Sequence, residues 1–110
     1  MKNNQKSVLN AIRRAAHKKI LFLPHAVRQM SRQDRMISGE EVIKVIENEE
    51  IVEDYPEDLR GHSCLMLGYG TQKRPLHVVC APKEDYLAVI TAYMPNKQEW
   101  AEGFKTRRKR

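Results

Sequence analysis

The chain has 110 residues, of which 41% are hydrophobic and 31% charged, and this length and composition indicate one folded domain. No apolar run is long enough to span a bilayer, and the basic N-terminus lacks the apolar core of a secretory signal. We therefore expect a soluble, cytoplasmic protein.

The net charge of +6 is concentrated at the two ends of the chain. Residues 1–35 carry nine Lys or Arg against one Asp, whereas residues 36–60 carry two against nine acidic side chains. Basic ends around an acidic middle predict a surface that binds a polyanion. Cys64 and Cys80 are isolated from each other in sequence, which is typical of buried small hydrophobes and not of zinc ligands.

Helical spacing of Val8, Leu9 and Ile12 predicts a first helix over residues 7–18, with Ser7 as its N-cap. The short apolar run over residues 20–23 then ends at Pro24. It predicts an edge strand or an extended link.

The run that follows, residues 24–36, predicts a second helix with a basic stripe. The stripe consists of His25, Arg28, Arg32 and Arg35, which are separated by three, four and three residues and so lie on one side of a helix. Val27 and Met30 fall on the opposite, apolar side. Guanidinium groups grip phosphate and imidazole exchanges protons near neutral pH, so the stripe suits a phosphate-rich partner. Spacing alone is at least as consistent with a solvated basic helix face.

The clearest helix start lies at Ser38. Ser38 and Glu41 have the spacing of a capping box, and Ile37 and Val42 that of a hydrophobic staple. A third helix is predicted from there to about Asn48.

Four strands are predicted next, over residues 51–55, 63–69, 74–81 and 86–94. Their short connections favour an antiparallel meander. Asn96 predicts the cap of a last helix through Trp100 and Phe104, followed by a charged tail. The fold class expected is α+β, with N-terminal helices followed by a four-stranded antiparallel sheet and a C-terminal helix.

The register of the last hairpin decides which side chains share a site. With Ala81 opposite Tyr86, Arg74 pairs with Tyr93 on one face and His77 lies on the other. A single site that uses both Arg74 and His77 therefore requires a bulge or a twist. A buried, hydrogen-bonded structural role is an equal alternative for His77.

Metal-free RNA cleavage requires a base, an acid and cations around the phosphate. His, Arg, Lys and Tyr can fill these roles, and they occur near the second helix and along the last two strands. The carboxylates cluster instead over residues 40–58, and no glycine-rich phosphate loop is present, so we expect no metal and no cofactor.

Several motifs occur in the order of a known family: HAVRQM, ISGEEVI, SCLMLGY, RPLHVV and ITAYMP. Over residues 22–105 the chain resembles a small prokaryotic domain of unknown function, DUF4258. The layout of that domain is similar to the RelE/ParE toxin superfamily and the BrnT toxins. The resemblance implies a RelE-like domain over 22–105, preceded by a basic helical extension (1–21) and followed by a basic tail (106–110).

The resemblance also implies an activity, that of a small mRNA interferase neutralised by an antitoxin encoded beside it. The family motifs single out five candidate catalytic residues: His25, Arg28, Arg74, His77 and Tyr93. The two arginines would bind phosphate, either histidine would act as general base or acid, and Tyr93 would position the RNA. Residues expected to hold flanking phosphates are Arg32, Arg35, Lys73, Lys97, Arg107 and Arg108. The chain lacks the compact lysine-and-arginine set of RelE itself, which leaves open whether cleavage depends on the ribosome.

Two alternatives remain at this stage. The first is a non-catalytic module of the same fold that binds nucleic acid or protein. The second is an interaction domain whose acidic helix pairs with a basic partner. An enzyme requires His25 or His77 close to Arg28 and Arg74 in one exposed cleft.

Overall fold

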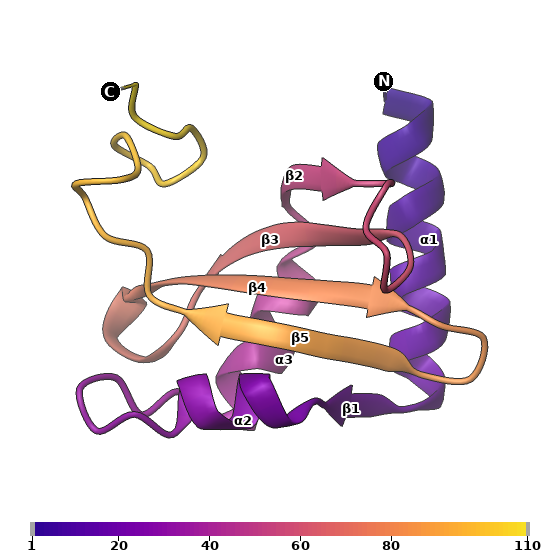
Figure 1. Cartoon of the computed structure of the whole chain (residues 1–110), viewed down its shortest axis with the longest axis horizontal. Helices are drawn as coiled ribbons and strands as arrows, with labels where there is room; N and C mark the ends of the chain where they lie inside the picture. The colour runs from indigo at the N-terminus through magenta and orange to yellow at the C-terminus, as the bar shows by residue number, and fades with distance from the viewer. Residues whose placement is uncertain (1, 110) are drawn as a thin grey trace.

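The computed structural model describes residues 2–109, in which three α-helices accompany a five-stranded mixed sheet (Figure 1). In chain order the elements are α1 (Lys2–Lys18), β1 (Ile20–Phe22), α2 (Pro24–Met30), α3 (Gly39–Asn48), β2 (Ile51–Tyr55), β3 (Ser63–Tyr69), the 3-10 turn η1 (Thr71–Lys73), β4 (Pro75–Pro82) and β5 (Leu87–Tyr93). None of the helices within residues 2–109 has the length and apolar character needed to cross a membrane.

The strand order is β1-β5-β4-β3-β2. The antiparallel meander of β2 to β5 is confirmed, but the predicted four-stranded antiparallel sheet is wrong. β1 adds a fifth strand that runs parallel to β5, with Ile20 opposite Leu87. A parallel pair needs a long connection, and here most of the domain lies between the two strands.

Both faces of the sheet are covered, by different parts of the chain. Helices α1 and α3 pack on the first face, and Figure 1 shows α3 behind the strands. Their buried apolar residues include Val8, Ile12, Ala15, Val42, Val45 and Ile46. Gly68 of β3 allows α3 to approach closely, because a Cβ at this position would lie 2.7 Å from the Cα of Val45. The second face packs against the C-terminal segment through Trp100 and Phe104.

The predicted start of α3 is confirmed. The Ser38 hydroxyl accepts a hydrogen bond from the Glu41 backbone N–H at 3.1 Å, and the Glu41 carboxylate accepts from the Ser38 N–H at 3.0 Å. Two backbone donors at the helix start are thereby satisfied. Helix α1 begins before Ser7, so Ser7 lies inside the helix and is not its cap.

The predicted second helix is too long. Helix α2 ends at Met30, and residues 31–36 form turns in which Met36 has a left-handed φ of 46°. Val27 is 47% exposed, so the apolar side of the predicted stripe is not buried as a whole. The guanidinium of Arg74 donates to the backbone carbonyls of Arg35 and Met36. This tertiary contact holds the segment in a non-helical path and overrides its helical spacing.

The predicted C-terminal helix is also wrong. The Asn96 side chain does accept from the Glu99 N–H at 2.9 Å, as a cap would, but only a turn follows. Residues 95–109 instead fold back over the second sheet face, where Trp100 is buried and its backbone pairs with Arg107. We call residues 95–109 the tail.

Candidate functional site

His77 and Tyr93 meet on the second sheet face, under the tail. They lie directly opposite each other on β4 and β5, and a bulge between Val79 and Cys80 changes the register of the two strands. The predicted register is therefore wrong, because Ala81 pairs with Ala88 and not with Tyr86.

The side chains of His77 and Tyr93 form a hydrogen-bonded chain with the tail backbone. His77 Nε2 lies 2.9 Å from the Phe104 carbonyl oxygen, which can only accept, so Nε2 carries the ring proton. The other nitrogen, Nδ1, accepts from the Tyr93 hydroxyl at 3.2 Å. Burial lowers the pKa of His77 and raises the pKa of Tyr93. Both groups are therefore neutral at pH 7.

An ion pair stands beside this chain. Arg107 of the tail donates from Nε and Nη2 to the two oxygens of Glu53 on β2, at 2.8 and 3.0 Å. The Tyr55 hydroxyl donates to the same carboxylate. The guanidinium holds the pKa of Glu53 below its usual value, and burial raises the pKa of Tyr55 to about 12.

Trp100 joins the two groups. Its ring meets the His77 imidazole edge to face, with 4.5 Å between the ring centroids, and the Arg107 guanidinium lies over the Trp100 ring, 4.7 Å from its centroid. Cation–π contact of this kind favours a fixed guanidinium position. We call these six residues the His77 cluster: Glu53, Tyr55, His77, Tyr93, Trp100 and Arg107.

The side chains of the His77 cluster differ in their exposure to solvent. His77 and Trp100 are buried, whereas the Arg107 side chain is 60% exposed and Tyr93 is half-buried. A ligand would therefore meet Arg107 and Tyr93 first, and His77 only through Tyr93.

Arg74 lies on the opposite face of the sheet and takes no part in the His77 cluster. Its guanidinium binds the buried Glu41 carboxylate at 2.7 and 3.0 Å, besides the two backbone carbonyls already described. Glu41 also accepts from the Thr71 N–H at 2.7 Å, and mainly the Arg74 hydrogen bond holds its pKa far below the usual range. Arg74 is thus fully engaged in holding three segments together, and the expectation that it shares a face with Tyr93 is wrong.

The other candidates from the sequence are dispersed. His25 and Arg28 are exposed on α2, and Arg32 and Arg35 lie 3.3 and 3.8 Å from Asp34 in the following turns. The remaining predicted phosphate ligands are exposed at two places, Lys73 in η1 and Lys97 and Arg108 in the tail. The exposed cleft expected of an enzyme, with His25 or His77 close to Arg28 and Arg74, is not formed.

Sequence reasoning missed Glu53, Tyr55 and Trp100. Glu53 and Tyr55 are two residues apart on a strand, so their shared face could have been inferred. Their partner could not, because the tail brings Arg107 to them from 54 residues away. Among residues 2–109 no three His, Cys, Asp or Glu side chains gather as metal ligands.

Comparison with known protein families gives a match over most of the chain. The model of a family described as a domain of unknown function (DUF4258) matches residues 22–94, which is more than half of the chain. The matched range includes His77 and Tyr93 and ends before Trp100 and Arg107. No curated protein and no solved structure gives a significant match. The similarity to RelE, ParE and BrnT toxins stays a prediction.

Proposed function

This chain belongs to the DUF4258 family, and we propose that it is a metal-free endoribonuclease that cleaves RNA at the His77 cluster. The observation that carries the proposal is the hydrogen-bonded chain from Tyr93 through His77 to the Phe104 carbonyl, beside the exposed Arg107. It supplies a proton path and a phosphate ligand in one place.

The proton path follows from the tautomer of His77. The Tyr93 oxygen takes the proton of an RNA 2′-hydroxyl while the Tyr93 proton passes to His77 Nδ1. The 2′-oxygen then bonds to phosphorus, the bond to the 5′-oxygen breaks, and the departing oxygen takes a proton from solvent. His77 afterwards gives its extra proton back to Tyr93, which releases its own proton to solvent. Burial and the positive charge of Arg107 oppose the intermediate imidazolium, whereas the Phe104 carbonyl and the negative charge of Glu53 favour it.

Arg107 is the phosphate ligand in this proposal. A guanidinium has five N–H donors, and the two hydrogen bonds to Glu53 leave others for a phosphate oxygen. Exposed cations elsewhere, such as Arg28 and Lys97, add attraction that does not depend on RNA sequence.

A second candidate function is binding without cleavage at the same surface. Two observations favour it: His77 has no exposed surface, and Glu53 neutralises much of the Arg107 charge. In that case the His77 cluster positions the tail, and the exposed tail cations bind RNA.

The products of the reaction test the proposal. Purified protein is incubated in EDTA with a single-stranded RNA, and with the same RNA carrying 2′-deoxy sugars. We expect 2′,3′-cyclic phosphate ends from the RNA and no cleavage of the deoxy substrate. Binding of both substrates without any cleavage, on free RNA or on ribosomes, would favour the second candidate.

In a cell, the proposal makes this chain the toxin of a toxin–antitoxin pair. Its induction should arrest growth and degrade RNA, and co-expression of the protein encoded beside it should restore both. A Tyr93→Phe variant should not arrest growth. If the variant arrests growth as strongly as the wild type does, the toxicity does not come from cleavage at the His77 cluster.

A further inference from the structure

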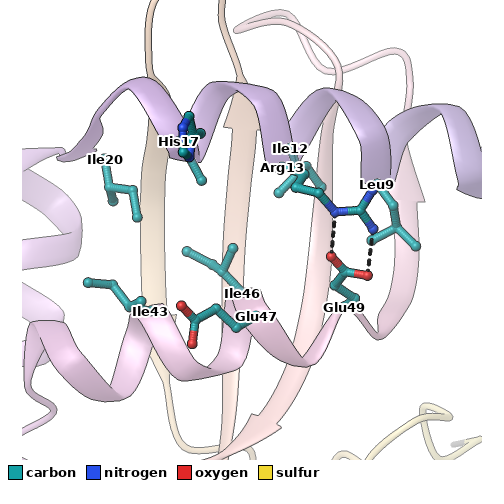
Figure 2. Close-up of a pocket in the computed structure, with 10 residues that line it drawn as sticks. Leu9, Ile12, Arg13, His17, Ile20, Ile43, Ile46, Glu47 and Glu49 are labelled. Carbon is teal, nitrogen blue, oxygen red and sulfur yellow. Dashed lines mark hydrogen bonds and ion pairs between the residues drawn. The ribbon is translucent and has the colours of Figure 1, made fainter.

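A groove runs between α1 and α3, on the outside of the first sheet face. It encloses about 350 Å³, and Figure 2 shows its lining. Leu9 of α1, Ile43 of α3 and Ile20 of β1 are only half-buried along it. These aliphatic side chains form an apolar strip that the rest of the described chain leaves uncovered.

The two walls of the groove carry opposite charge. Arg13 and His17 stand on the α1 wall, and Glu47 and Glu49 on the α3 wall. Arg13 closes one end through two hydrogen bonds to Glu49, at 2.8 and 2.9 Å. Further along, His17 and Glu47 lie on opposite walls in Figure 2, and neither has a hydrogen bond or ion pair within residues 2–109. The middle of the groove therefore presents an imidazole on one wall and an unpaired carboxylate on the other.

This arrangement is self-complementary. The two helices run antiparallel along the groove (Figure 2). Consider a two-fold axis that lies above the groove and runs parallel to the two helices. Rotation about this axis places a second copy face to face with the first, with its α1 wall over the first copy's α3 wall. The α1 wall of each copy then faces the α3 wall of the other, so that His17 meets the partner's Glu47. The apolar strips meet between four antiparallel helices, as in the core of a helix bundle.

We propose that a second copy of this chain covers the groove, giving a two-fold dimer joined by α1 and α3. The charge pattern supports this occupant because the surface supplies both halves of the match. The proposal does not depend on RNA cleavage, since the His77 cluster lies on the other face of the sheet.

Sedimentation equilibrium of the wild-type protein, from low micromolar to submillimolar concentration, tests the proposal. We expect the mass of two chains at the upper concentrations. His17→Glu places two carboxylates opposite each other, and Glu47→Lys removes the carboxylate that faces the partner's His17 and brings a cation to the wall that carries Arg13. Each should weaken the dimer about tenfold or more at low salt. The double variant places a Glu opposite a Lys and should recover most of the affinity.

Both substituted side chains are exposed, and circular dichroism with thermal unfolding verifies that the variants fold. Glu57→Lys makes the same charge change on an exposed residue outside the groove, and should leave the dimer unchanged. A monomer at every concentration overturns the proposal. The groove would then bind a helix of another protein or a small apolar molecule. A dimer that both single variants leave intact also overturns it, because its interface then lies elsewhere.

Discussion

His77 and Tyr93 face each other because β5 contains one extra residue. Ala81 pairs with Ala88, and continuing that register would place Ala92 opposite His77. The bulge shifts the pairing by one residue and brings Tyr93 to the same face of the sheet, within 3.2 Å of the imidazole.

The tautomer of His77 can be measured directly. Nitrogen-15 NMR of the imidazole at pH 7 should show a neutral ring with the proton on Nε2, because the Phe104 carbonyl can only accept. Since burial lowers the pKa of His77, the ring should become protonated only at a lower pH than an exposed imidazole does. A proton on Nδ1 at pH 7 would contradict the proposed proton path.

Arg74 should matter for stability and not for cleavage. Arg74→Met leaves the Glu41 carboxylate buried without its cation, and should lower the free energy of unfolding by roughly 3 kcal/mol. Urea unfolding measures the change. Arg28→Ala, on an exposed residue without a hydrogen bond within residues 2–109, should change it by less than about 0.5 kcal/mol. Equal effects of the two substitutions would contradict the structural role of Arg74.

The Glu41–Arg74 pair should also appear in the pH dependence of stability. The pKa of Glu41 is lower in the folded chain than its ordinary 4.5, so the unfolded chain binds more protons at acid pH. The stabilisation is fully present above pH 4.5 and is lost as the pH falls towards the folded pKa. Wild type should therefore lose more stability between pH 5 and pH 3 than Arg74→Met does. Parallel pH profiles would show that the pair does not lower the Glu41 pKa.

Arg107 and Glu53 should affect RNA affinity in opposite directions. Arg107→Ala removes one phosphate ligand, and should weaken binding and reduce the slope of log affinity against log salt by about 0.7. Glu53→Gln removes the competing carboxylate charge and should strengthen binding. Fluorescence anisotropy with a labelled single-stranded RNA measures both. Arg60→Ala and Asp58→Asn form the matched control, because they belong to an ion pair of 2.9 Å in the β2–β3 loop whose arginine is 61% exposed and whose aspartate is 11% exposed. If the control variants change RNA affinity as much as the Arg107 and Glu53 variants do, Arg107 is not part of the binding site.

Local signals in the sequence predicted the elements whose structure depends on neighbours in the chain. The capping box of Ser38 and Glu41 marks the start of α3, and Pro56 and Gly70 mark the C-terminal ends of β2 and β3. Short connections also predicted the meander correctly, because they leave antiparallel pairing as the accessible arrangement.

Contacts between distant segments decided the rest. The parallel pairing of β1 with β5 joins residues far apart in sequence, and a run of three residues carries no sign of it. Arg74 redirects residues 31–36 away from a helix, and the burial of Trp100 redirects the tail. The His77 cluster was predicted only in part for the same reason, since it depends on a bulge and on the tail folding back.

The most direct test of the proposed function is the single-turnover rate of RNA cleavage by Tyr93→Phe, measured in EDTA. This substitution removes one hydroxyl and keeps the ring, and the exposed Tyr69→Phe is its matched control. We predict that Tyr93→Phe lowers the rate by about 10²–10⁴ with RNA affinity unchanged, and that Tyr69→Phe cleaves at the wild-type rate. Wild-type cleavage by Tyr93→Phe, or no cleavage by the folded wild-type chain on free RNA or on ribosomes, would contradict the proposed activity of the His77 cluster.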